Sequence, residues 1–409
     1  MRPLVSFVLA AAAVALGAPA CSDDMEGHGG MNMMGASGHG GGATHGGSGG
    51  AGGDHMGASG MGHGGDAGHG GAPSGPPSST PIAAITYNAL FVVNGGDSSV
   101  SVINAETNEV AGTVALQNAP YPHHLYLSPD RATMLLAVPG MDLSGGHGST
   151  GGAGGTHGGT HGGGSEAMPG IVMLLDATTG ATRATRTLPA MNHNAIFSPD
   201  GAEVWTSQMV DPGSVLVLDA ATLGDKASIA VQNGPAEVTF SASGAYAFVA
   251  NTESDSVTVI KAADKTVAKT ITVGDAPVGA WQGANGVAYV DNEAGKSLTA
   301  IDTTTLEITR TIPLGFTPGM AALGPDGMVW VTDADNGKVS MFMADTGEKH
   351  MDIATGAGAH GIAFSGDGKT AYVSNQAGDT VSVIDVAQGA STKTLTVGKA
   401  PNGLVWRAK

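Results

Sequence analysis

The chain has 409 residues, of which 67 are Gly, and only 13% of its residues are charged. Globular proteins average about 7% Gly and about 25% charged residues, so both departures are large. The glycines crowd into residues 27–71 and 145–164 without a Gly-X-Y period, which excludes a collagen helix. The formal net charge is −18, and no Lys or Arg occurs between Arg2 and Arg131. Binding to a phosphate backbone needs clustered cations, so we expect no nucleic-acid partner.

Residues 1–20 have the pattern of a secretory signal peptide. Arg2 provides a positive start, and the apolar run over residues 4–16 is too short to span a membrane. Cys21, the only Cys in the sequence, follows directly and resembles the Cys that is lipidated in bacterial lipoproteins. This resemblance implies an exported protein of the periplasm, or of the outer membrane or cell surface, that contacts the membrane only through its lipid anchor. The alternative is ordinary cleavage after Ala20, which would leave Cys21 as a free thiol.

Residues 21–80 are predicted to form a disordered tether. Their Gly, Ala, Ser and Asp residues supply too little apolar area to offset the entropy of ordering the chain. The candidate metal ligands of this tether are His and Met side chains: His28, Met31, Met33, Met34, His39, His45, His55, Met56, Met61, His63 and His69.

A second Gly-rich tract, residues 142–168, carries His147, His157 and His161. Neutral imidazole binds Cu(II) and Zn(II), and thioether sulfur selects Cu(I). We therefore expect weak metal binding by both tracts, with copper as the first candidate. The alternative is that the tracts are only flexible spacers.

From residue 87 onward a unit of about 42 residues recurs, which is the range expected of propeller blades. One strand of the unit ends in a polar residue, at LFVVN (90–94), VWTSQ (204–208), AFVAN (247–251), AYVDN (288–292), VWVTD (329–333) and AYVSN (371–375). A second strand follows a short turn, at SVSVIN (99–104), GIVMLLD (170–176), SVLVLD (214–219), SVTVIK (256–261), SLTAID (297–302), KVSMFM (338–343) and TVSVID (380–385). From Asp176 to Asp385 the last residues of these second strands lie 41–43 residues apart.

A third strand, such as KTITV (269–273), completes each unit, and a fourth strand follows it and ends in a turn such as SPDG. The chain ends with one fourth-type strand at 400–409, whereas the repeat begins at residue 87 without one. We therefore predict an all-β fold, a seven-bladed β-propeller over residues 81–409 whose C-terminal strand closes the first blade. The tract 142–168 is then a loop inserted within one blade.

Three segments of the last unit, AYVSN (371–375), TVSVID (380–385) and HGIAFSGDG (360–368), resemble the YVTN-repeat β-propeller family. The resemblance extends over residues 87–409. It implies the propeller fold, whereas members of the family serve as binding, surface-layer, lactonase-like and cofactor-holding modules.

Three His residues of the predicted propeller, His123, His193 and His360, occupy one repeat position at the start of the innermost strands. Asn402 shares this position, and His124 follows His123. We expect His123, His124, His193 and His360 to converge at the channel mouth, where imidazoles suit copper, as Cu(I) or Cu(II), or zinc. The alternative is a set of polar channel residues that only holds water.

The remaining chemistry of the sequence is sparse. No C-x-x-C-H motif for haem, no P-loop for a nucleotide and no G-x-S-x-G elbow occurs, so neither haem nor nucleotide is expected and no catalytic residue is assigned. Asp and Glu residues are scattered at strand ends and turns, where we expect solvated positions. The Trp residues are expected to pack between sheets.

Three functions are compatible with this pattern. The first is an envelope-anchored binding or scaffold protein with metal-binding tracts and a His site at the channel mouth. The second is a propeller enzyme, lactonase-like or metal-dependent redox, that uses the central channel. The third is a surface module for protein interaction, whose acidic charge would favour a basic partner.

Overall fold

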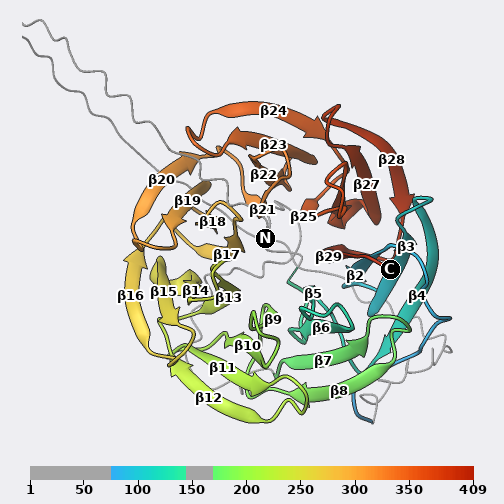
Figure 1. Ribbon diagram of the computed structural model, residues 1–409, viewed down its shortest axis with the longest axis horizontal. Coiled ribbons are helices and arrows are strands. Elements are labelled where there is room, and N and C mark those ends of the chain that lie inside the picture. The colour runs from blue at the N-terminus through green and yellow to red at the C-terminus, as the bar shows by residue number, and fades with distance from the viewer. Residues whose placement is uncertain (1–74, 144–168) are drawn as a thin grey trace, which may run out of the picture. The chain divides into compact units, whose positions relative to one another are not determined.

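The alternating and apolar runs of the repeat form antiparallel sheets arranged around a central channel (Figure 1). The computed structural model describes residues 75–143 and 169–409. Within these ranges there are six four-stranded sheets and one five-stranded sheet, so the predicted seven-bladed propeller is confirmed. Cys21 and the His and Met ligands proposed within residues 21–80 and 142–168 lie outside the described residues. No helix in the described part is long and apolar enough to cross a membrane.

The first three blades contain the N-terminal half of the described chain. Blade 1 consists of β1 (Ser78–Ser79), β2 (Ala89–Asn94), β3 (Ser99–Asn104), β4 (Glu109–Gln117) and β29 (Pro401–Arg407). Blade 2 consists of β5 (Leu125–Leu127), β6 (Thr133–Val138), β7 (Ile171–Asp176) and β8 (Thr182–Thr187). Blade 3 consists of β9 (Ala195–Phe197), β10 (Glu203–Gln208), β11 (Ser214–Asp219) and β12 (Asp225–Ala230).

The other four blades follow the same order from the channel outward. Blade 4 consists of β13 (Pro235–Phe240), β14 (Tyr246–Asn251), β15 (Ser256–Lys261) and β16 (Val267–Thr272). Blade 5 consists of β17 (Pro277–Gln282), β18 (Val287–Asn292), β19 (Ser297–Asp302) and β20 (Ile308–Pro313). Blade 6 consists of β21 (Pro318–Leu323), β22 (Met328–Asp333), β23 (Lys338–Met343) and β24 (Lys349–Ala354). Blade 7 consists of β25 (Ala359–Phe364), β26 (Thr370–Asn375), β27 (Thr380–Asp385) and β28 (Ala390–Thr396). Short 3-10 helices η2 (Thr252–Ser254) and η3 (Gln376–Gly378) follow β14 and β26.

The C-terminal strand closes the ring, as predicted. β29 pairs with β2 in antiparallel register from Ala89 opposite Arg407 to Asn94 opposite Pro401. It is the innermost strand of blade 1, in the place that β5 occupies in blade 2. One strand is missing from the sequence-based assignment. β6 ends in Val138 rather than in a polar residue, so the pattern used to find its six equivalents does not detect it.

The segment between β6 and β7 contains the tract 142–168, yet the two strands pair with each other from Thr133 opposite Asp176 to Val138 opposite Ile171. The sheet therefore continues across the insertion. Near the N-terminal end of the described residues, β1 pairs with the outer strand β4. β1 lies within residues 21–80.

The hydrophobic core lies between blades rather than within them. Each of the seven clusters of buried apolar side chains joins two neighbouring blades, including blade 7 with blade 1. The two middle strands of a blade are buried on both faces, while the outermost strands such as β16 are mainly exposed. Because the middle strands are covered on both sides, the sequence there is apolar and nearly free of charge.

The Asn that ends the polar-ended strand has a structural role in four blades. The Nδ2 of Asn94, Asn251, Asn292 and Asn375 donates to two hydroxyls of the next strand in its own blade. For Asn251 these acceptors are Ser256 Oγ at 3.2 Å and Thr258 Oγ1 at 3.0 Å. The amide is fully buried, so the hydrogen bonds of Nδ2 replace those that this group would make to water. Within the described residues, Oδ1 of Asn94, Asn251 and Asn292 accepts no hydrogen bond.

Replacing this Asn should destabilise the propeller. We expect Asn251→Ala to lower the free energy of unfolding by about 1–3 kcal/mol, because two buried hydroxyls lose their donor. The measurement is urea unfolding followed by circular dichroism. The control is Gln282→Ala, which removes an exposed amide and should change stability by less than about 0.5 kcal/mol. Equal effects of the two substitutions would contradict this role.

Candidate functional site

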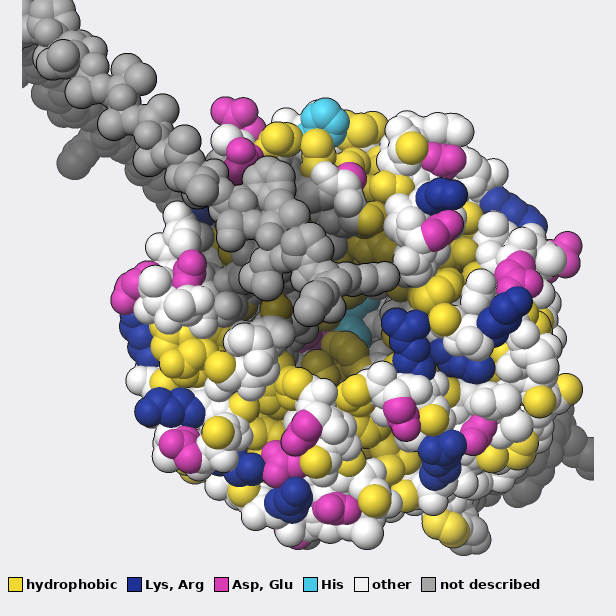
Figure 2. Space-filling view, viewed as in Figure 1, with side chains coloured by type: hydrophobic (Ala, Val, Ile, Leu, Met, Phe, Trp, Pro, Cys, Tyr) yellow, Lys and Arg dark blue, Asp and Glu magenta, His cyan; other side chains and the backbone are white. Residues whose placement is uncertain are grey.

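The innermost strands bring the aligned His residues to one place. β25, β29, β5, β9 and β13 are successive neighbours around the channel (Figure 1). His360 and Asn402 are the second residues of β25 and β29, and His123 and His193 lie two residues before the starts of β5 and β9. Since all these strands run in the same direction through the ring, their starts share one end of the channel. Figure 2 shows a hollow near the centre of one face, with a His side chain on its floor.

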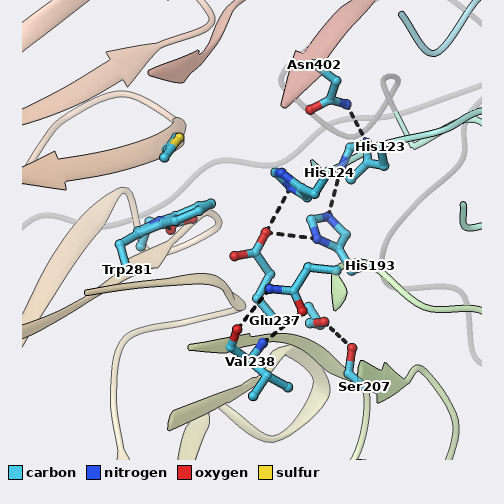
Figure 3. Close-up of polar contacts among 12 residues, drawn as sticks. His123, His124, His193, Ser207, Glu237, Val238, Trp281 and Asn402 are labelled. Carbon is cyan, nitrogen blue, oxygen red and sulfur yellow. Dashed lines mark hydrogen bonds and ion pairs between the residues drawn. The ribbon is translucent and has the colours of Figure 1, made fainter. Parts of the chain in front are cut away.

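The side chains of this cluster form a continuous chain of contacts (Figure 3). Asn402 Nδ2 lies against His123 Nδ1, and His123 Nε2 lies 3.1 Å from His193 Nε2. His193 Nδ1 lies 3.1 Å from Glu237 Oε1, and His124 Nε2 lies 2.9 Å from the same oxygen. These five residues are only 1–6% exposed. The contacts are therefore shielded from bulk water. In such a protein interior, hydrogen bonds are stronger than in water.

Three of the predicted ligands lie close enough together that they could hold a metal ion. One ligand atom each from His123, His124 and His193 lies within 4.8 Å of the others. The 3.1 Å between His123 Nε2 and His193 Nε2 is close to the edge of a tetrahedron with metal–nitrogen bonds of about 2.0 Å, which is about 3.3 Å. The fourth predicted ligand, His360, lies farther away, with its ring centre 5.8 Å from that of His123.

Glu237 is the main residue of the site that the sequence analysis does not identify. It lies in β13, one residue after Ala236, and occupies the repeat position of His124. In blades 5, 7 and 1 this position is a Gly, namely Gly279, Gly361 and Gly403. A carboxylate at a repeat position that is Gly in three of the seven blades is the signal that could have found it.

The neighbouring blade fixes the backbone around Glu237. Asn194 Oδ1 accepts the Val238 N–H at 3.0 Å, and Asn194 Nδ2 donates to the Val238 carbonyl at 3.0 Å. Ser207 Oγ donates to the Ala236 carbonyl (Figure 3). Hydrogen bonds thus fix the backbone on both sides of Glu237, and its side chain lies between two imidazoles.

Other blades also carry a hydroxyl at the repeat position of Ser207, and it too donates to a backbone carbonyl of the next blade. Thr332 Oγ1 donates to the His360 carbonyl at 2.7 Å, and Ser374 Oγ donates to the Asn402 carbonyl at 2.6 Å. In each case a strand of one blade holds the innermost strand of the next blade at the aligned position. The cluster therefore rests on a fixed backbone.

The two imidazoles stabilise the ionised form of Glu237. Burial by itself raises the pKa of this carboxyl, but the attraction of His124 and the hydrogen bonds from His124 and His193 outweigh it and lower the pKa to about 2. The cluster therefore contains a carboxylate with almost no exposure to solvent. Its second oxygen, Oε2, accepts no hydrogen bond from the described residues.

Two further buried acids lie on the blade 5 side of the channel. Trp281 Nε1 donates to Asp291 Oδ1 at 2.5 Å, and the Trp281 ring centre lies 6.1 Å from that of His124. Burial, then the charges of Glu293 and Glu237, raise the pKa of Asp291 well above its usual range. Burial and Glu237 raise the pKa of Glu293 to about 8. The expectation that acidic residues occupy solvated positions is wrong for Glu237, Asp291 and Glu293, because the channel wall buries them.

Comparison with known proteins places the chain by its fold. No protein-family model and no curated protein matches the sequence, so the resemblance to the YVTN-repeat family stays a prediction. The solved structure of the periplasmic gluconolactonase PpgL of Pseudomonas aeruginosa is similar, with a TM-score of 0.62 and 19% identity over 78% of this chain and 99% of that chain. A functionally unknown protein from Desulfotomaculum acetoxidans has a TM-score of 0.62 and 13% identity over 78% of this chain and 99% of that chain. The dihydro-heme d1 dehydrogenase NirN has a TM-score of 0.55 and 17% identity over 78% of this chain and 68% of that chain. The chain is a seven-bladed β-propeller protein, and at these identities the likeness extends to the fold alone.

The buried acid Glu293 should make the stability of the protein depend on pH. Its pKa in the folded chain, about 8, lies above the value of about 4.3 expected in the unfolded chain. The folded state therefore binds the proton more tightly, and stability should fall as pH rises from about 5 to about 8. We expect Glu293→Gln to remove this loss, which amounts to a few kcal/mol at about 1.4 kcal/mol per pKa unit.

Urea unfolding at pH 5, 6.5 and 8 measures the effect. The control is Glu253→Gln, at an exposed carboxylate, which should leave the pH profile of the wild type unchanged. An unaltered profile in Glu293→Gln would show that Glu293 titrates normally.

Proposed function

We propose that this chain is an exported propeller protein that binds a transition-metal ion, zinc or copper, at its channel mouth through His123, His124 and His193. The observation that carries the proposal is the set of three buried imidazoles whose ligand atoms lie within 4.8 Å of one another. Burying several imidazoles against each other costs desolvation energy. A bound metal ion, which pairs with their lone pairs, offsets that cost.

The residues around the imidazoles support this proposal. Metal-binding His residues commonly donate their second ring N–H to a carboxylate, which orients the ring and makes it a better ligand. Glu237 Oε1 lies 3.1 Å from His193 Nδ1, which leaves His193 Nε2 to face the metal. The negative charge of Glu237 also partly neutralises a divalent cation in a region that water hardly reaches.

The donor set favours zinc or copper over harder cations. The cluster offers imidazole nitrogens, which suit zinc and copper, whereas Mg²⁺ and Ca²⁺ prefer oxygen ligands. A soft ligand near the aligned repeat position would be Met320, which follows Gly319. Its sulfur instead accepts the Ile362 N–H at 3.2 Å, and the side chain packs against the core of blades 5 to 7. Within the described part of the chain the site is therefore a nitrogen site.

The N-terminal features complete the proposal. The signal-peptide pattern and Cys21 support export and lipid anchoring, and the His and Met residues of 21–80 and 142–168 support weak capture of copper near the propeller. These tracts contribute through their composition, and the channel site through its geometry. We propose that the tracts and the channel bind metal independently.

Removing two channel ligands should abolish the tight site. We expect the His123→Ala/His193→Ala variant of the mature full-length chain to retain one metal ion fewer per chain, because only one imidazole of the triad remains. The measurement is elemental analysis after loading with Zn²⁺ or Cu²⁺ and desalting, with competition by a chelator of known affinity.

His350→Ala is the matched control, because His350 is exposed on the outer strand β24 and belongs to none of the His tracts. It should retain as much metal as the wild type. Equal metal content in the wild type and the double variant would disprove the channel site while leaving binding by the tracts intact.

A second candidate function is hydrolysis of a lactone in the channel. It is favoured by Glu237, a buried carboxylate beside two imidazoles whose Oε2 accepts no hydrogen bond from the described residues. With a pKa of about 2 this carboxylate is a weak base, so it would hold a water molecule at Oε2 and accept its proton only as that water attacks. If the wild type hydrolyses sugar lactones, we expect Glu237→Gln to lower kcat by about 10²–10⁴-fold. No turnover of any lactone by the metal-loaded wild type would rule this function out.

A further inference from the structure

We infer that Asn402 is a positioning residue that sets the tautomer of His123, and that its side-chain amide must turn over when a metal ion binds His123 Nε2. The first part concerns the hydrogen bonds of the cluster alone. The second part rests on the proposed metal site. It deepens that proposal by identifying the residue that controls access of the metal to one of its ligands.

The hydrogen bonds of the cluster run in series from Asn402 to Glu237. In the orientation of the amide that places Nδ2 against His123, Asn402 donates and His123 Nδ1 accepts. A neutral His123 then carries its proton on Nε2 and donates it to His193 Nε2 at 3.1 Å. His193 carries its own proton on Nδ1 and donates it to Glu237 Oε1 at 3.1 Å. Every bond in the series thus has one donor and one acceptor, with both imidazoles neutral.

The opposite orientation of the amide leads to a different charge state. With Oδ1 toward His123, the imidazole would donate from Nδ1 and accept at Nε2. His193 would then have to donate from Nε2 to His123 and from Nδ1 to Glu237, which makes it an imidazolium. The two orientations of Asn402 therefore correspond to distinct proton positions that can be measured.

A metal ion on His123 Nε2 requires the His123 ring to carry its proton on Nδ1, as in the opposite orientation of the Asn402 amide. The ion takes the Nε2 lone pair, so the proton of a neutral ring moves to Nδ1, where it needs an acceptor. Asn402 Oδ1 can supply it if the amide rotates by about half a turn. Within the described residues, Oδ1 accepts no hydrogen bond, so on that side the rotation breaks none.

The backbone around Asn402 keeps the residue in place while the amide turns. Ser374 Oγ donates to the Asn402 carbonyl at 2.6 Å, and the Gly403 N–H donates to the His123 carbonyl at 3.0 Å. A Cβ on Gly403 would lie 2.9 Å from His124 Cα and 3.0 Å from the His123 carbonyl oxygen, so only Gly permits this approach. Strand β29 thus lies close enough for Asn402 to control His123.

The experiment reads the tautomer directly, by long-range ¹H–¹⁵N NMR of the full mature chain with ¹⁵N-labelled His, stripped of metal by a chelator. His123→Gln assigns the His123 signals by their loss. We expect wild-type His123 to be protonated on Nε2 without metal and on Nδ1 after addition of Zn²⁺. Asn402→Asp offers only acceptors, so His123 should be protonated on Nδ1 in both states, and Zn²⁺ should bind about 10-fold more tightly.

Two further variants make the result unambiguous. Asn285→Asp adds the same charge at an exposed turn and should leave the His123 tautomer and the Zn²⁺ affinity as in the wild type. Asn402→Leu removes the donor and should give a mixture of His123 tautomers, which provides a second readout if Asn402→Asp does not fold.

The outcomes separate the two parts of the inference. Nδ1 protonation of His123 in the metal-free wild type, or an unchanged tautomer in folded Asn402→Asp, would overturn the role of Asn402. If the tautomers follow the prediction but Zn²⁺ does not shift the His123 signals, the amide still positions His123 and the proposed metal site is wrong.

Discussion

The pairing of β29 with β2 is the constraint on which the rest of the structure depends. It joins residues 89–94 to residues 401–407, at opposite ends of the described chain, and makes blade 1 complete. An open array of blades would leave one apolar face of a blade and one sheet edge exposed to water. Closure buries both, and it places β29, which carries Asn402, between β25 and β5. The site therefore exists only in the closed ring.

Burial in the channel determines the chemistry of the side chains that the ring brings together. The outer strands carry the polar residues that contact water, whereas the channel contains His123, His124, His193 and Glu237 with almost no exposure. In such a place a charge must be compensated by a partner. The attraction of His124 and the hydrogen bonds from His124 and His193 lower the pKa of Glu237, while burial and then neighbouring carboxylates raise the pKa values of Asp291 and Glu293. The few ionisable groups that are buried in the channel therefore interact strongly with one another.

The proposed metal site and the lactonase alternative use the same residues in different ways. In the first, Glu237 orients the imidazoles as ligands, and in the second it takes a proton itself. Asn402 bears only on the proposed metal site, because it contacts Nδ1 of His123, and the proton on that ring must leave Nε2 before Nε2 can bind a metal. The similarity to PpgL and NirN extends to the fold alone, and one fold can serve different functions. The decision between a metal site and a lactonase site therefore depends on the side chains of this channel.

The sequence by itself determined the repeat, the number of blades and the closing strand. These follow from strand patterns such as AYVSN and TVSVID and from their spacing, which are local properties of the chain. It also aligned His123, His193 and His360, because one repeat position corresponds to one height in the channel. Only the tertiary structure decided that Glu237 accepts from two imidazoles, that His360 stands apart from the triad, and that Asn402 contacts His123. Those relations depend on side-chain directions between blades and on residues up to 279 positions apart, such as His123 and Asn402. A repeat pattern carries no information about such contacts, since it records the position of a residue along its strand but not what its side chain meets across the channel.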